Sequence, residues 1–145
     1  MDAGSARDLT AIVRTLVDAR DDLRALAVCG SGARGNPRPD SDLDLLIVAR
    51  DVARWRDAHD WIGELPYGEA RLAYRSHTAA RYGAVWSAHI RLEPDAALEL
   101  TFAAPDWANH DPVDPGTRQV VRDAFAIVVD KDKHLARLVE ACAGG

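Results

Sequence analysis

The sequence lacks most of the features that mark secreted, membrane or DNA-binding proteins. It has only two cysteines, Cys29 and Cys142, and their spacing is typical neither of a disulfide framework nor of a metal site. It has no basic excess, since its formal net charge is -5, and this argues against duplex nucleic acid or an anionic membrane as a partner. No apolar run approaches the roughly 18 residues of a membrane helix, and the N-terminus does not resemble an export signal. We therefore expect a cytoplasmic protein.

The chain nevertheless has enough apolar residues to build a core. Its 145 residues are 48% hydrophobic, and they contain no internal repeat, low-complexity stretch or linker. We expect a single domain over residues 1–145.

Apolar spacing alternates between helical and strand periods along the chain. Helices are predicted over residues 5–23, 51–65, 117–124 and 133–141. Strands are predicted over residues 26–29, 42–48, 70–74, 84–92, 98–102 and 126–129. This order predicts an α+β fold, a mixed β-sheet with helices packed on it.

Two aspartates lie at the start of the second predicted strand, where an unpaired carboxylate is costly. The run Asp-Leu-Asp-Leu-Leu-Ile-Val places Asp42 and Asp44 on one face of the strand because side chains alternate with a period of two. Two neighbouring carboxylates repel each other unless a cation lies between them, and hard oxygen ligands suit Mg²⁺. The structural alternative is that Asp42 belongs to a turn and Asp44 is a solvated edge residue.

A glycine-rich bend follows the first predicted strand. Gly30 and Ser31 end that strand, and backbone N-H groups and a hydroxyl at such a bend suit a phosphate chain. Glycine turns after strands are common, so this feature gains weight only from the two aspartates that follow it.

Together these residues resemble the signature of the DNA polymerase β-like nucleotidyltransferase superfamily. The resemblance covers Gly30-Ser31-x-Ala33-Arg34-Gly35 and Ser41-Asp42-x-Asp44. It implies a polymerase β-like fold and a nucleotide site that includes Gly30, Ser31, Arg34 and Ser41. It further implies that Asp42 and Asp44 hold divalent metal, two Mg²⁺ ions being expected, with a third carboxylate from a later strand.

Glu99 is the best candidate for that third carboxylate. It is the only acidic residue within 96–103, and it faces away from Leu98 and Leu100. Glu93 and Asp95 are weaker candidates because they fall in a turn. Glu99 has three open roles, which are metal ligand, general base or both.

Other polar residues have weaker claims on the site. Arg38, Arg71 and Arg75 have a possible role in neutralising a triphosphate, although a solvated surface charge explains them better. His89 shares a strand face with Val85 and Ser87, which favours either a place beside the acceptor or a structural role.

The resemblance implies transfer of a nucleoside monophosphate, AMP from ATP, to an acceptor hydroxyl, an activity of the EC 2.7.7 type. The acceptor is unidentified; an aminoglycoside-like small molecule is one expectation, with a homodimer completing the pocket. The alternative is a minimal nucleotidyltransferase antitoxin that binds and adenylylates a helical partner toxin. A nucleotide binder without turnover is a third hypothesis.

Overall fold

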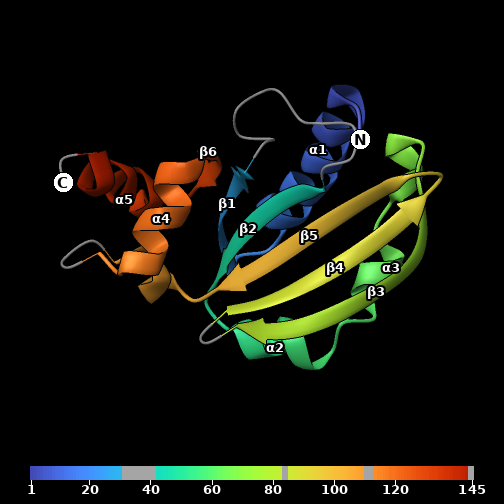
Figure 1. Cartoon of the computed structure of the whole chain (residues 1–145). Coiled ribbons are helices and arrows are strands. Elements are labelled where there is room, and N and C mark those ends of the chain that lie inside the picture. The colour runs from blue at the N-terminus through green and yellow to red at the C-terminus, as the bar shows by residue number, and fades with distance from the viewer. Residues whose placement is uncertain (31–41, 83–84, 110–112, 144–145) are drawn as a thin grey trace.

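A six-stranded sheet forms the centre of the computed structural model, which describes residues 1–30, 42–82, 85–109 and 113–143 (Figure 1). The strand order is β3-β4-β5-β2-β1-β6. Strands β2 and β5 are parallel, whereas the pairs β1/β2, β1/β6, β3/β4 and β4/β5 are antiparallel, so the sheet is mixed. The strands are β1 (Leu23–Cys29), β2 (Leu43–Ala49), β3 (Ala73–Tyr82), β4 (Val85–Glu93), β5 (Ala96–Ala103) and β6 (Phe125–Asp130).

Helices cover both faces of this sheet, which confirms the predicted α+β class. Figure 1 shows α4 and α5 gathered near β6, at the end of the sheet away from β3. None of the described helices is long and apolar enough to cross a membrane. The helices are α1 (Ala3–Ala19), α2 (Val52–Asp57), α3 (Trp61–Glu64), α4 (Pro115–Asp123) and α5 (His134–Ala143), with short 3-10 turns η2 (Tyr67–Ala70) and η3 (Pro105–Ala108).

The two sheet faces carry separate apolar clusters because side chains alternate along each strand. In β2, Leu45 and Ile47 join the larger cluster, which α1, α2 and α3 cover. Leu46 and Val48 join the smaller one, which α5 covers. At the centre of the larger cluster, the ring of Phe102 is stacked with that of Trp55, and their centroids are 5.9 Å apart.

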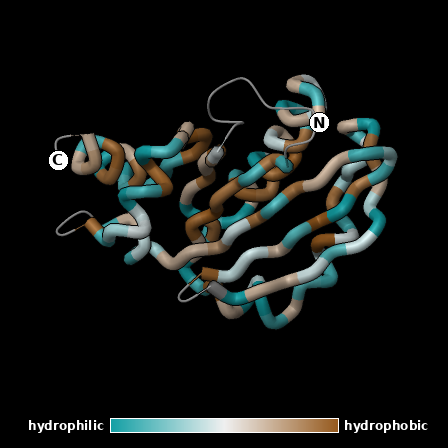
Figure 2. Tube along the Cα trace, viewed as in Figure 1, coloured by the Kyte–Doolittle hydropathy of each residue, from teal (hydrophilic) through white to brown (hydrophobic). Residues whose placement is uncertain are grey.

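Strand β3 forms an open edge of the sheet. Every residue from Ala73 to Arg81 except His77 is exposed. Figure 2 shows this strand mostly pale or hydrophilic in colour, whereas β1 and β2 carry long hydrophobic stretches. Two arginines and a register irregularity between Tyr74 and Ser76 are features that disfavour pairing of this edge with another strand.

The first predicted helix has the wrong boundaries. We predicted residues 5–23, but α1 covers Ala3–Ala19 and β1 already begins at Leu23. Asp2 is the N-cap, because its carboxylate accepts a hydrogen bond of 2.7 Å from the amide of Ser5. Leu23 is fully buried in the sheet, so tertiary packing overrides the helical spacing there.

The predicted helix over residues 51–65 is two short helices, α2 and α3. Asp51 caps α2 as expected, but Ala58 is extended and breaks the helix. The indole Nε1 of Trp61 donates to the carbonyl oxygen of Trp55 at 3.3 Å, and the two rings meet edge to face. Both tryptophans pack on the sheet, since each ring contacts the ring of Phe102 in β5.

Among the remaining predicted elements, one strand is displaced. We predicted a strand over residues 70–74, whereas β3 covers Ala73–Tyr82 and Tyr67–Ala70 is a 3-10 turn. In that turn, the Tyr67 hydroxyl donates to the carbonyl oxygen of Ile62 at 2.6 Å, which anchors it to α3. The other predicted strands and the last two helices are confirmed to within a few residues.

Candidate functional site

A row of polar side chains crosses four neighbouring strands on one sheet face. Asp44 of β2 is opposite Glu99 of the parallel strand β5. Glu99 is in turn opposite His89 of β4, and on the other side Asp44 is opposite Cys29 of β1. Neighbouring strands are about 4.8 Å apart, so residues in register on one face are within contact range. The row therefore brings two of the predicted site residues together from parts of the sequence far apart.

The strand pleat explains why these carboxylates share a face. The residues that flank Glu99, Leu98 and Leu100, are fully buried in the larger apolar cluster. Asp44 likewise lies between core residues of that cluster, Leu43 and Leu45. Because neighbours along a strand point to opposite faces, Asp44 and Glu99 both point to the other side. The prediction that Glu99 faces away from the core is thus in agreement with the burial pattern.

The surroundings of Asp44 disfavour the charged form of its carboxyl group. Its pKa is raised to about 6, first because burial disfavours the charged form and then because the carboxylates of Glu99 and Asp42 are close. In the described part of the chain, no basic side chain forms an ion pair with Asp44 or Glu99. The site therefore concentrates negative charge, and a bound cation would reduce the repulsion between these carboxylates.

Asp42 lies just before β2 and contacts a residue from another strand. Its Oδ2 atom is 2.7 Å from Nε2 of His89. Both side chains are partly exposed, 44% for Asp42 and 37% for His89. The contact passes over β5, because β5 separates β4 from β2 in the sheet. Asp42 is thus held on the same face as Asp44 and Glu99.

Cys29 is the fourth residue of the row, and its thiol is unreactive as a nucleophile. Burial raises its pKa to about 12, and the charges of Asp44 and Glu99 act in the same direction. The thiolate is the nucleophilic form of cysteine, so a thiol with this pKa is unreactive near neutral pH. Cys29 and Cys142 are both free and buried.

A second polar pair follows the row along β4 and β5. The hydroxyl groups of Ser87 and Thr101 are 2.8 Å apart, and these residues are opposite each other in the sheet. Ser87 is 6% exposed, so this hydrogen bond satisfies two hydroxyls on a partly covered surface. Small side chains here leave room on the sheet face next to Glu99.

Gly30 follows β1 directly, at the entrance to the predicted phosphate loop. Its φ of +66° is a left-handed conformation that glycine adopts without strain. Its amide donates to the carbonyl oxygen of Ala124 at 3.2 Å, so this N-H is already used within the fold. The other nucleotide-binding residues that we predicted, Ser31, Arg34 and Ser41, lie outside the described residues, as does Arg38.

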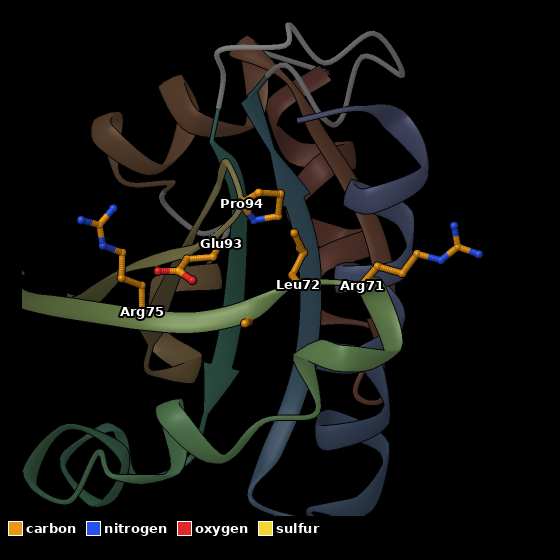
Figure 3. Close-up of a pocket in the computed structure, with 6 residues that line it drawn as sticks. Arg71, Leu72, Arg75, Glu93 and Pro94 are labelled. Atoms are coloured by element: carbon orange, nitrogen blue, oxygen red, sulfur yellow. The ribbon is translucent and has the colours of Figure 1, made fainter.

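Arg71 and Arg75 do not converge on a shared site. They line a shallow hollow with Leu72, Ala73, Glu93 and Pro94. Figure 3 shows their guanidinium groups pointing away from each other, on opposite sides of this hollow. Both residues are exposed, in keeping with the interpretation of solvated surface charges.

The donor set suits a hard divalent cation, although the side chains are not arranged around one. Asp42, Asp44 and Glu99 supply only carboxylate oxygens, which Mg²⁺ prefers. Among the residues that the structure describes, no three His, Cys, Asp or Glu side chains are close enough together to hold a metal ion. One oxygen of Asp42, Oδ2, contacts Nε2 of His89. The residues fit Mg²⁺ by their chemistry, and binding requires their side chains to move together.

The contact between His89 and Asp42 is the feature that the sequence analysis missed. Alternation in β4 places His89 on the same face as Ser87, which we noted. The sequence does not show that β4 and β2 are separated by a single strand, which is what lets His89 reach Asp42. One pattern in the sequence could have indicated this contact. It is a histidine on the polar face of a strand, near a predicted carboxylate site.

Comparison with known proteins identifies part of the chain. Residues 10–79 match a family model described as a nucleotidyltransferase domain. The match includes Gly30, Asp42 and Asp44, whereas His89 and Glu99 lie beyond it. A search of curated proteins gives no match. The match over residues 10–79, together with the mixed sheet, is consistent with a polymerase β-like nucleotidyltransferase fold.

Proposed function

We propose that this protein is a metal-dependent nucleotidyltransferase that transfers a nucleoside monophosphate, AMP from ATP, to a hydroxyl group of an acceptor. The observation that carries the proposal is the pairing of Asp44 with Glu99 across the parallel strands β2 and β5. Asp42 lies beside them on the same face. The family match supports nucleotidyl transfer in general; donor, acceptor and metal are parts of the proposal.

In this proposal the three carboxylates are the catalytic and metal-binding groups. Asp42, Asp44 and Glu99 provide oxygen ligands for two Mg²⁺ ions. Bound Mg²⁺ supplies positive charge against the triphosphate and the attacking oxygen. The raised pKa of Asp44 supports this role, because burial and acidic neighbours prepare the site for a cation.

The proposed reaction is a displacement at the α-phosphorus of the triphosphate. The acceptor oxygen forms a bond to this phosphorus while the bond to the bridging oxygen of the β-phosphate breaks, and pyrophosphate leaves. The proton of the hydroxyl passes to Glu99 or to water. Gly30, Ser31, Arg34 and Ser41 are proposed to bind the triphosphate. Holding both reactants in line on this surface supplies much of the rate enhancement.

Calorimetry with ATP tests the donor and metal parts of the proposal. We expect wild-type protein to bind ATP with Mg²⁺ far more tightly than without it. The double variant Asp42→Asn with Asp44→Asn removes two negative charges from the site and should abolish the Mg²⁺-dependent part. Circular dichroism should show an intact fold. Unchanged Mg²⁺-dependent affinity in the double variant would refute the site.

The acceptor requires a separate experiment. We propose an aminoglycoside-like hydroxyl compound, and the small side chains of Ser87 and Thr101 beside Glu99 are compatible with a substrate there. A helical partner toxin is the second candidate, and the exposure of β3 near the site favours it because this flank is open to a large molecule. A screen with labelled triphosphates against both classes, including the product of the neighbouring gene, discriminates them by which one becomes labelled. A dimer contributing to the pocket would appear in the same preparations by light scattering.

A further inference from the structure

The hydrogen bond between His89 and Asp42 links two distant strands directly at the proposed metal site. Nε2 of His89 and Oδ2 of Asp42 are 2.7 Å apart, although 47 positions separate the residues in the sequence. A hydrogen bond at this distance to a charged acceptor is among the stronger kinds in proteins. The contact therefore has the strength to orient the Asp42 side chain.

The register of the sheet shows why His89 reaches this carboxylate. His89 is opposite Glu99, and Glu99 is opposite Asp44. His89 is thus in register with the paired carboxylates, and its imidazole extends over β5 to reach Asp42. Asp42 lies just before β2, whereas Asp44 lies within it. Of the three carboxylates, Asp42 is the one for which the described residues show a side-chain hydrogen bond.

The chemistry of the contact leaves one oxygen of Asp42 for a ligand. An ionised carboxylate only accepts hydrogen bonds, so Nε2 of His89 is the donor. It is bonded to Oδ2, and a carboxylate with one oxygen held in this way still presents the other, Oδ1. Hydrogen bonds of this kind behind metal ligands orient them and raise metal affinity.

We propose that His89 is a positioning residue of the divalent-cation site. It acts through Asp42, holding that side chain so that Oδ1 joins the oxygens of Asp44 and Glu99 around a cation. The inference rests on the proposed function, since it needs a cation site at these carboxylates. It adds a residue beyond both the family match and the three carboxylates.

Calorimetry at one fixed pH, which measures the binding of Mn²⁺ alone to the full chain, tests the proposal. This measurement does not depend on nucleotidyl transfer. We expect His89→Ala to weaken Mn²⁺ binding by about 10-fold or more, the usual cost of losing such a partner. His89→Gln should restore most of the affinity, because its amide N-H lies close to the position of Nε2. Thr78→Ala is the matched control, since Thr78 is exposed and opposite His89 on β3, and it should bind Mn²⁺ like the wild type.

Each other outcome has a definite meaning. Equal or tighter Mn²⁺ binding by His89→Ala overturns the proposal, because His89 is then a bystander or a competitor of the cation. Failure of His89→Gln to restore affinity also overturns it, since the hydrogen bond is then not the cause. If the wild-type protein binds no Mn²⁺, there is no divalent-cation site, and both the proposed function and the role of His89 are refuted. His89 is partly exposed, so we expect these variants to fold, and circular dichroism checks this.

Discussion

At Asp44 the fold and the proposed function make opposite demands. The proposed function needs a charged carboxylate, whereas the fold disfavours that charge. The Asp44 pKa of about 6, against an ordinary value of 3.8, means that the folded protein disfavours the charged form. The folded state therefore binds the proton more tightly than the unfolded chain does. It follows that stability is lost as the pH rises from about 4 to 6, and the cost is complete above that range.

We accordingly expect Asp44→Asn to stabilise the protein in a pH-dependent way. Without divalent cations, the free energy of unfolding above about pH 6 should rise by ~1–3 kcal/mol relative to the wild type. Below about pH 4 the two proteins should differ little, because the wild-type carboxyl is then neutral. Urea unfolding across this range, in the presence of a chelator, measures the difference. A difference that stays constant with pH contradicts this account.

At the scale of elements, the start of α5 is fixed by a single side chain. The carboxylate of Asp130 accepts hydrogen bonds from the amides of Leu135 and Ala136, at 3.2 and 2.9 Å. Asp130 is the last residue of β6, so the residue that ends this strand also accepts hydrogen bonds from the first turn of α5, which begins at His134.

We expect Asp130→Ala to destabilise the protein by about 0.5–2 kcal/mol through loss of the cap. Asp130→Asn keeps an acceptor oxygen and should retain most of the stability. Thermal or urea unfolding measures both. Asp106→Ala is the control, because Asp106 is exposed in η3, where no side-chain cap is present, and it should behave like the wild type. Equal losses in the Asp130 and Asp106 variants would count against the cap.

For the whole molecule, the division of the sheet into two faces separates stability from the site. Ile47 is fully buried on the face of the larger cluster, in the same strand as Asp44. Ile47→Val should lower the free energy of unfolding by about 0.5–1.5 kcal/mol, because a buried methyl group is lost. Since the two side chains point to opposite faces, Mn²⁺ affinity should not change.

Urea unfolding and calorimetry on the same Ile47→Val preparation test this separation. A control on the site face is Asp42→Asn, which should show the opposite pattern of near-normal stability and weakened Mn²⁺ binding. A marked loss of Mn²⁺ affinity in Ile47→Val would mean that the core on one face determines the geometry on the other.

Much of this architecture was accessible from local patterns, and the exceptions share a cause. Period-two alternation predicted which side chains of β2, β4 and β5 face the core, and so predicted that Glu99 faces away from it. Helical spacing failed where long-range packing decides, as over residues 51–65, where Ala58 is extended and Trp61 donates to the Trp55 carbonyl oxygen. It failed also at Leu23, where pairing with Ala49 draws the residue into a strand.

The sequence by itself determined the kinds of element, the polar face of each strand and the acidic residues that this face carries, because these follow from side-chain periodicity over a few positions. Only the tertiary structure decided that Asp44 is opposite Glu99 and that His89 reaches Asp42. Strand order and register are set by how the whole sheet buries its two clusters of side chains, and no local stretch of sequence contains that information.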